Sequence, residues 1–212
     1  LALFDTWCEI SHGGLPPNSA CRGMEWFRPI EGIHAAHQLR QSMTPQNPRF
    51  SYSVSDYPLE DYSTGLIAGQ TVRFLEQHRD NPFALWVSFP DPHEPWVAPE
   101  QYAAMFPPEK IDLPPWPEKE FDQCTPERNR VLYQMLNMTE DDLADVYGLM
   151  AVYYGMVRFI DDGLGQILEA LEALDLRKNT IVVFCSDHGD FMGEHRMQCK
   201  GGVFYDCLTR VP

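Results

Sequence analysis

Residues 180–212 have the sequence TIVVFCSDHGDFMGEHRMQCKGGVFYDCLTRVP, and this stretch decides the fold class of the chain. Its first six residues, 180–185, are rich in β-branched and aromatic side chains, a pattern that predicts a fully buried strand. The polar segment SDHGD follows directly, at residues 186–190. Open α/β sheets place ligand-binding groups just beyond the carboxyl ends of their strands, so the stretch predicts an α/β fold with a site at this segment.

Asp187 and His188 stand side by side in this polar segment and are candidate metal ligands. A carboxylate oxygen and an imidazole nitrogen are both common metal donors. Lys200 follows thirteen residues after Asp187. The alternative interpretation is a polar loop that only caps a strand and carries an exposed lysine.

Two helices are predicted upstream of this stretch. Thr139 followed by Asp142 resembles a capping box, and it predicts a helix from there to about residue 174. Residues 61–64 predict the start of another helix, whose apolar face extends to about residue 79, where an Asp-Asn-Pro sequence ends it.

The sequence FALWVSF at residues 83–89 predicts a second buried strand. The proline-rich residues 90–117 predict a loop with short turns. Residues 1–58 show no helical period, and they predict a long irregular excursion. A helix, a strand and then a polar loop is the order of elements typical of α/β proteins.

Three segments occur in a fixed order along the chain: SFPDPHEPW at residues 88–96, YYGMVRFIDD at residues 153–162, and the terminal series SDHGD, GEH, Lys200, Tyr205 and RVP. Together they resemble the type I sulfatases of the alkaline-phosphatase-like superfamily. The resemblance covers the chain from about residue 60 to its end. It implies a partial three-layer α/β sandwich with a mostly parallel central sheet, and it implies hydrolysis of a sulfate ester of a small molecule or a saccharide.

The resemblance also implies roles for individual residues. Asp187 and His188 match the family's metal ligands, and Lys200 matches the lysine that contacts the sulfate. His93 matches a histidine that contacts the substrate or helps to eject it, and its chemistry would be proton donation near neutral pH. The implied cofactor is a divalent cation, calcium in the first place, with manganese as the alternative because imidazole suits a softer metal.

Two parts of the family pattern do not occur before the SFPDPH segment: a pair of Asp ligands, and the Cys-x-Pro-x-Arg segment whose Cys or Ser becomes formylglycine. We therefore expect residues 1–212 to be one partial sulfatase catalytic domain, an internal fragment of a longer enzyme that is inactive alone. Two alternatives stay open. One is a phosphonate monoester or phosphodiester hydrolase of the same superfamily, and the other is a non-catalytic scaffold that lacks the nucleophile.

Two segments imitate family motifs in the wrong place. The sequence CTPER at residues 124–128 fits Cys-x-Pro-x-Arg, but it follows the SFPDPH segment, whereas the family places its nucleophile before it. We expect Cys124 to be unmodified. Asp161 and Asp162 are a carboxylate pair in the middle of a predicted helix, where adjacent side chains point about 100° apart. We expect structural contacts for this pair.

His195 in the GEH sequence has two interpretations: it lines the pocket, or it orients a ligand from behind. The other charged residues near it are expected to brace the loop. These are Asp190, Glu194 and Arg210.

Length and composition limit the classes of function. A chain of 212 residues can bury a sizeable core. Its net charge of −15 argues against a nucleic-acid partner. No uninterrupted apolar run reaches the roughly 18 residues of a membrane span. The six cysteines have no regular spacing, which favours free thiols and a reducing compartment, but the compartment and the oligomeric state are left unassigned.

Overall fold

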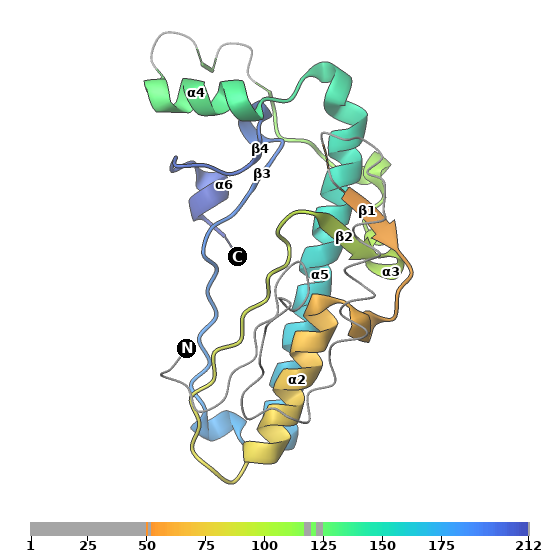
Figure 1. The fold of residues 1–212 in the computed structure, drawn as a ribbon, viewed down its shortest axis with the longest axis vertical. Coiled ribbons are helices and arrows are strands. Elements are labelled where there is room, and N and C mark those ends of the chain that lie inside the picture. Colours follow the sequence, from red (N-terminus) through yellow and green to blue (C-terminus); the bar gives the residue numbers. More distant parts are fainter. Residues whose placement is uncertain (1–49, 51, 117–119, 122–124, 212) are drawn as a thin grey trace, which may run out of the picture. The chain divides into compact units, whose positions relative to one another are not determined.

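One long helix, α5 (Leu143–Ala173), runs through a mixed α/β structure that is described here from a computed structural model (Figure 1). The chain divides into two units, and α5 begins in the second and continues in the first. Unit 1 consists of the described residues up to Phe106 together with Val152–Ile181. Unit 2 consists of the described residues within Pro107–Ala151 and within Val182–Pro212. The residues that the structure describes are 50, 52–116, 120, 121 and 125–211.

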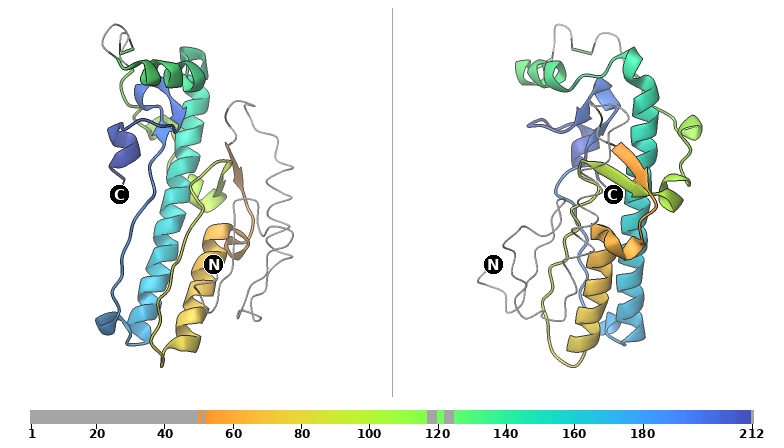
Figure 2. Two further views of the ribbon diagram at one scale, coloured as in Figure 1. Left: turned by 60° about the vertical axis from the view of Figure 1, so that its left-hand side comes forward. Right: turned by 45° about the vertical axis from the view of Figure 1, so that its right-hand side comes forward.

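Unit 1 contains a parallel strand pair and two long helical segments. Strand β1 (Tyr52–Ser55) pairs with β2 (Trp96–Pro99), with Tyr52 opposite Trp96, and Figure 2 shows the two strands side by side. Helix α2 (Ser63–His78) lies along α5 in all views. A Cβ atom built on Gly163 of α5 would lie 3.4 Å from the Ala68 side chain of α2, so the two helices approach closely. The short elements of unit 1 are η1 (Leu59–Asp61), α3 (Glu100–Ala103) and η4 (Arg177–Asn179).

An aromatic cluster forms the core beside this strand pair. Tyr62, Val97, Tyr102 and Phe159 are all buried in it. The Tyr62 and Phe159 rings meet edge to face, with centroids 5.8 Å apart, a favourable arrangement for aromatic side chains. The Tyr102 hydroxyl donates a hydrogen bond of 3.0 Å to Asp162, which satisfies its polar end. Burial raises the pKa of Tyr102, and the hydrogen bond to Asp162 adds to the rise.

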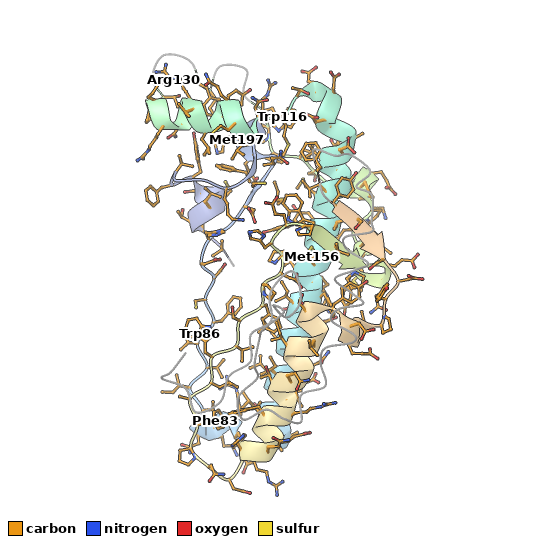
Figure 3. All side chains as sticks on the ribbon, in the orientation of Figure 1. Phe83, Trp86, Trp116, Arg130, Met156 and Met197 are labelled. Carbon is orange, nitrogen blue, oxygen red and sulfur yellow. The ribbon has the colours of Figure 1, made fainter. Side chains whose placement is uncertain are left out.

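Unit 2 has a separate core beneath a short antiparallel ribbon. Strand β3 (Phe191–Met192) pairs with β4 (Gln198–Cys199), and Phe191 packs with the buried Met197, Val203 and Leu208. The Trp116 indole donates a hydrogen bond of 2.7 Å to the carbonyl of Gly193 in the turn of this ribbon, and Figure 3 labels Trp116 and Met197 there. The helices of unit 2, besides the first part of α5, are η2 (Pro108–Lys110), α4 (Glu127–Leu136), η3 (Glu140–Asp142), η5 (Glu194–Arg196) and α6 (Asp206–Thr209).

The structure confirms both predicted helices and the predicted capping box. The helix expected over residues 61–79 is α2, and the helix expected over residues 139–174 comprises η3 and α5. Thr139 and Asp142 exchange the reciprocal hydrogen bonds of a capping box. By length and composition alone, Glu140–Ala173 could cross a membrane. Core helices of globular domains share these properties, and Val146, Leu149 and Val152 of α5 are buried in protein.

The two predicted buried strands, residues 83–89 and 180–185, are wrong for the part of the chain that the structure describes. Neither run is assigned as a strand. Trp86, labelled in Figure 3, is 75% exposed, and Ile181 is 93% exposed. A sequence rich in β-branched and aromatic residues shows that a segment suits a sheet, but a strand also needs a partner for its backbone hydrogen bonds. The described residues supply none to these two runs.

The expected loop over residues 90–117 also needs correction, because it contains the buried strand β2, the helix α3 and the 3-10 turn η2. The irregular excursion expected over residues 1–58 lies mostly outside the described residues, and within it residues 52–55 form β1. The fold class itself is confirmed: the described residues combine helices with a parallel strand pair, as an α/β fold requires.

Candidate functional site

The polar segment of residues 186–190, termed the DHG loop, presents its two candidate ligands to solvent. The Asp187 side chain is 84% exposed, and its Oδ1 accepts a hydrogen bond of 2.9 Å from the His188 backbone amide. His188 Nδ1 lies 2.9 Å from the Gly189 carbonyl oxygen. Because a carbonyl only accepts, Nδ1 carries the proton, and in the neutral imidazole Nε2 then keeps its lone pair.

This tautomer brings two electron-pair donors face to face. His188 Nε2 lies 3.4 Å from Asp187 Oδ2. A carboxylate oxygen and a neutral imidazole nitrogen at this distance repel each other unless a proton or a cation attracts both. A histidine whose other ring nitrogen is held by a carbonyl is the usual form of a metal-bound histidine. The donor chemistry of the DHG loop therefore fits a cation.

Backbone contacts with α6 hold the DHG loop in place. The Gly189 amide donates a hydrogen bond of 2.9 Å to the Leu208 carbonyl. A Cβ atom on Gly189 would lie only 2.0 Å from the Cys207 carbonyl oxygen, so no side chain fits there. Burial raises the pKa of the Cys207 thiol to about 12, and the negative charge of Glu194 adds to the rise. Cys207 is therefore a neutral packing residue at neutral pH and not a nucleophile.

An ion pair holds Lys200 beside the DHG loop. Its ammonium nitrogen lies 3.5 Å from Asp190 Oδ1, and the Asp190 side chain is only 8% exposed. A cation beside a buried carboxylate offsets part of the cost of removing that charge from water. Asp187, His188 and Lys200 are thus parts of one local structure within unit 2. Asp190 connects them, as expected of a residue that braces the loop.

His93 lies in unit 1, on a segment termed here the PDPH loop, residues 90–95. Its backbone amide donates to the Pro90 carbonyl at 3.3 Å, and its Nδ1 lies 2.7 Å from the Glu94 carbonyl oxygen. Asp91, two residues earlier, accepts hydrogen bonds from Ser63 and Thr64 at the start of α2. Because both loops follow a predicted strand, and parallel strands open to the same edge of a sheet, the sequence predicts that His93 and the DHG loop face one cleft. The two loops belong to different units, so this stays a prediction.

His195 has a partner that the sequence did not indicate. Its Nδ1 bonds the carboxylate of Glu120, which is 75 residues away along the chain. The His195 ring packs on Tyr205 with centroids 4.1 Å apart, and Asn129 donates a hydrogen bond of 3.0 Å to the Tyr205 hydroxyl. Glu120 stands in a polar stretch without a motif, so no sequence signal identified it. The arrangement ties the loop before Lys200 to the segment before α4.

The sequences that imitate family motifs have the structural contacts expected of them, where they are described. Arg158 bonds the carboxylate of Asp161 and lies 2.6 Å from that of Asp162, which also accepts the Tyr102 hydroxyl. Both carboxylates therefore have structural partners in unit 1. Cys124 lies outside the described residues. Among the residues that are described, no group of three or more His, Cys, Asp or Glu side chains could hold a metal.

A sulfatase family model matches residues 15–212. The sulfatase YidJ of Escherichia coli is 33% identical over 150 residues, which cover 69% of this chain and 29% of that protein. Human iduronate 2-sulfatase is 32% identical over 161 residues, covering 68% of this chain and 28% of the relative.

Two solved structures resemble the fold. The phosphonate monoester hydrolase of Agrobacterium radiobacter superposes with a TM-score of 0.62 at 28% identity, covering 79% of this chain and 35% of that one. The putative sulfatase yidJ of Bacteroides fragilis superposes with a TM-score of 0.52 at 26% identity, covering 69% and 29%. The chain thus spans between 28% and 35% of each of these four proteins.

Proposed function

The chain belongs to the sulfatase family, and on that premise we propose that it supplies the cation-binding and sulfate-binding loop of a sulfuric ester hydrolase. The observation that carries the proposal is the DHG loop. There a carboxylate and a neutral imidazole nitrogen face each other at 3.4 Å, and the Lys200 ammonium is held beside the same loop by Asp190.

Asp187 and His188 would hold a divalent cation, calcium in the first place and manganese as the alternative. When bound, such a cation polarises an oxygen of the ester. Calcium takes six or more oxygen ligands, so two donors on one loop are part of a set that other residues and water complete. The fit rests on the tautomer of His188, whose Nδ1–H is engaged by the Gly189 carbonyl.

Lys200 would neutralise the negative charge that develops on the sulfuryl group or the leaving oxygen. The chain carries a net charge of −15, so an anionic ester needs local positive charge to bind. A preorganised ammonium group lowers the energy of a transition state without the cost of reorienting water. The ion pair with Asp190 would keep Lys200 at the loop in the absence of substrate.

His93 would act as the proton donor to the leaving oxygen. Its Nδ1 is protonated because it faces the Glu94 carbonyl oxygen at 2.7 Å. The imidazolium form therefore has Nε2–H as the group that can give up a proton to a leaving oxygen. The attacking group is proposed to be a formylglycine outside the described residues, as the family resemblance implies.

A second candidate is hydrolysis of a phosphonate monoester. The solved hydrolase of this type from Agrobacterium radiobacter supports it, with a TM-score of 0.62. Sulfate monoesters and phosphonate monoesters are both tetrahedral anions, so a cation and a lysine can serve either. A third candidate, a scaffold without a nucleophile, would keep the loop but show no turnover of either ester.

The test uses the full-length protein that contains this chain, supplied with 4-nitrophenyl sulfate and with a phenylphosphonate monoester. We expect the sulfate ester to be the better substrate. Asp187→Ala should reduce turnover on the order of 100-fold or more and weaken calcium binding measured by calorimetry. Asp175→Ala removes a 90% exposed carboxylate and is the matched control. Preference for the phosphonate would favour the second candidate, and absence of turnover on both esters would favour the third.

A further inference from the structure

Asp91 joins the PDPH loop to α2 through two side-chain hydrogen bonds. Its Oδ2 accepts one hydrogen bond of 2.8 Å from the Ser63 hydroxyl and another of 2.7 Å from the Thr64 hydroxyl. Both donors are buried, and Thr64 is fully so. A single carboxylate oxygen thus joins two neighbouring residues of α2 to a loop that lies 27 residues or more away along the chain.

These contacts occur at the first turn of α2, where a negative charge is favourable. The residue that precedes the helix, Tyr62, makes no capping hydrogen bond with its side chain. The backbone amides of a first helical turn have no partners within the helix, and they create a partial positive charge there. Hydrogen bonds from hydroxyls to an ionised carboxylate are also stronger than bonds between neutral groups. Asp91 is therefore attracted to this helix end both by its charge and by its hydrogen bonds.

The end of α2 is a rigid support for the loop. A Cβ atom built on Gly65 would lie 2.0 Å from the Leu59 carbonyl oxygen and 3.3 Å from the Phe159 ring, so this turn is packed tightly against η1 and α5. On its other side, the loop continues into β2, where Trp96 is 2% exposed. His93 thus lies between Asp91, which is hydrogen-bonded to α2, and the buried strand β2.

We propose that Asp91 is a positioning residue for His93: by fastening the PDPH loop to the first turn of α2, it fixes the imidazole for proton transfer to the leaving oxygen. The inference rests on the function proposed above for His93. In that step the nucleophilic oxygen bonds to sulfur, and the bond from sulfur to the leaving oxygen breaks with its electron pair on that oxygen. The proton of the His93 imidazolium moves to the leaving oxygen, which releases an alcohol and a neutral imidazole.

The leaving group provides a readout that a general loss of structure would not affect. A 4-nitrophenolate ion leaves readily without a proton, whereas an alkoxide needs one. Loss of an aimed proton donor should therefore slow an alkyl sulfate far more than 4-nitrophenyl sulfate. In the full-length enzyme we expect Asp91→Ala to lower kcat for the alkyl ester roughly 10- to 100-fold, because a small misplacement of a catalytic group has effects of this size. The aryl ester should lose only a few-fold.

Conservative and double variants separate this role from simple stabilisation. Asp91→Asn keeps an oxygen that accepts the two hydroxyls, so it should retain most of the alkyl-ester activity. A double variant, Ser63→Ala with Thr64→Val, removes the donors but keeps Asp91, and it should reproduce the leaving-group effect of Asp91→Ala. In a His93→Ala background, Asp91→Ala should cause no further change in the ratio of the two rates. Asp80→Ala, which removes an 85% exposed carboxylate, is the matched control.

The possible failures are distinguishable. If His93→Ala changes both esters equally, the proposed role of His93 is wrong, and the inference falls with it. If His93→Ala shows the leaving-group effect but Asp91→Ala and the hydroxyl double variant do not, the role of Asp91 alone is overturned. If Asp91→Ala does not fold, as judged by its melting temperature, the hydroxyl double variant decides the question by the same ratio.

Discussion

The DHG loop and the PDPH loop both follow an apolar run that the sequence predicts to be a buried strand, but they are held in different ways. In unit 2, the DHG loop is fixed to α6 by its backbone: the Gly189 amide bonds the Leu208 carbonyl, and the backbone of α6 leaves no room for a side chain at Gly189. In unit 1, the PDPH loop is fixed by a side chain, since Asp91 accepts two hydroxyl hydrogen bonds from α2.

The difference teaches which substitutions each loop should tolerate. A backbone contact depends on space, so the critical residue is one whose side chain must be absent. A side-chain contact depends on an acceptor oxygen, so a residue that retains this oxygen can replace the original. The predictions below test this contrast, beginning with the largest expected effect.

Two cysteines of unit 2 should react with an alkylating reagent at very different rates. Cys185 is exposed, whereas burial raises the pKa of Cys207 to about 12. At pH 8 the thiolate fraction of Cys207 is therefore on the order of 1000 times smaller than that of an ordinary thiol, and iodoacetamide should label Cys185 far faster. Site-resolved mass spectrometry of the native protein measures both rates. Equal labelling would show that the packing of Cys207 against the core of unit 2 does not bury its thiol.

The same raised pKa gives a dependence of stability on pH. Between pH 9 and about 12 the thiol of Cys207 ionises in the unfolded chain but not in the folded one. The unfolded state then binds fewer protons, so the contribution of Cys207 to the free energy of unfolding falls as the pH rises through this range. A Cys207→Ser variant should show a shallower loss of stability there.

Lys200 should have the next largest effect, because the charge beside the DHG loop acts on the ester itself. We expect Lys200→Met to reduce kcat/KM of the full-length enzyme for an aryl sulfate roughly 100- to 1000-fold. Lys178, which is 89% exposed, provides the matched control, Lys178→Met. Asp190→Asn keeps the ammonium group of Lys200 but removes the carboxylate charge that pairs with it, and it should have a smaller effect. Activity equal to that of the control would show that Lys200 serves only to pair the buried Asp190.

Gly189→Ala should test the backbone contact directly. The added methyl group would lie 2.0 Å from the Cys207 carbonyl oxygen and 3.0 Å from the Val211 side chain, so the loop or α6 has to move. We expect a loss of about 2 kcal/mol in the free energy of unfolding, as for other overpacked sites. Gly202→Ala is the matched control, because no atom beyond Gly202 and its chain neighbours lies within 4 Å of its added Cβ. Urea denaturation of both variants measures the difference, and equal midpoints would contradict the backbone account.

The sequence predicts the helices of the fold better than its strands. The reciprocal bonds between Thr139 and Asp142 are local, so a capping box and an apolar period were sufficient to predict α5. Strands depend on partners that are distant in the sequence. The strand β2 was missed because Trp-Val-Ala-Pro is short and follows several prolines, and its partner β1 lies more than 40 residues earlier. Residues 83–89 have strand composition but no pairing partner among the described residues.

The candidate site shows the same division between local and distant information. Asp187, His188 and Lys200 were identified by their motif, and the close placement of Lys200 follows from Asp190 in the same motif. The anchors, Asp91 and Glu120, were missed as partners because each acts on a residue far away in the chain, Thr64 and His195 respectively. No spacing rule connects such pairs. The tertiary fold brings them together.

Thr64→Val should have the smallest effect and complete the contrast between the loops. The change keeps the shape of a fully buried side chain but removes one of the two hydroxyls that bond Asp91, and the bond from Ser63 remains. We expect a loss of roughly 1 kcal/mol in the free energy of unfolding. Amide hydrogen exchange should quicken at His93, whose own amide bonds the Pro90 carbonyl within the PDPH loop.

Thr71→Val is a matched control for this variant on the same helix. The Thr71 hydroxyl bonds the Ile67 carbonyl of α2 itself, at 2.8 Å, and does not reach the PDPH loop. Its removal can loosen the helix, but it should leave exchange at His93 unchanged. If both variants quicken exchange at His93 equally, the loop responds to the stability of α2 and not to its hydrogen bond with Asp91. In that case the two loops would still have different supports, but no single side chain of α2 would control the position of the PDPH loop.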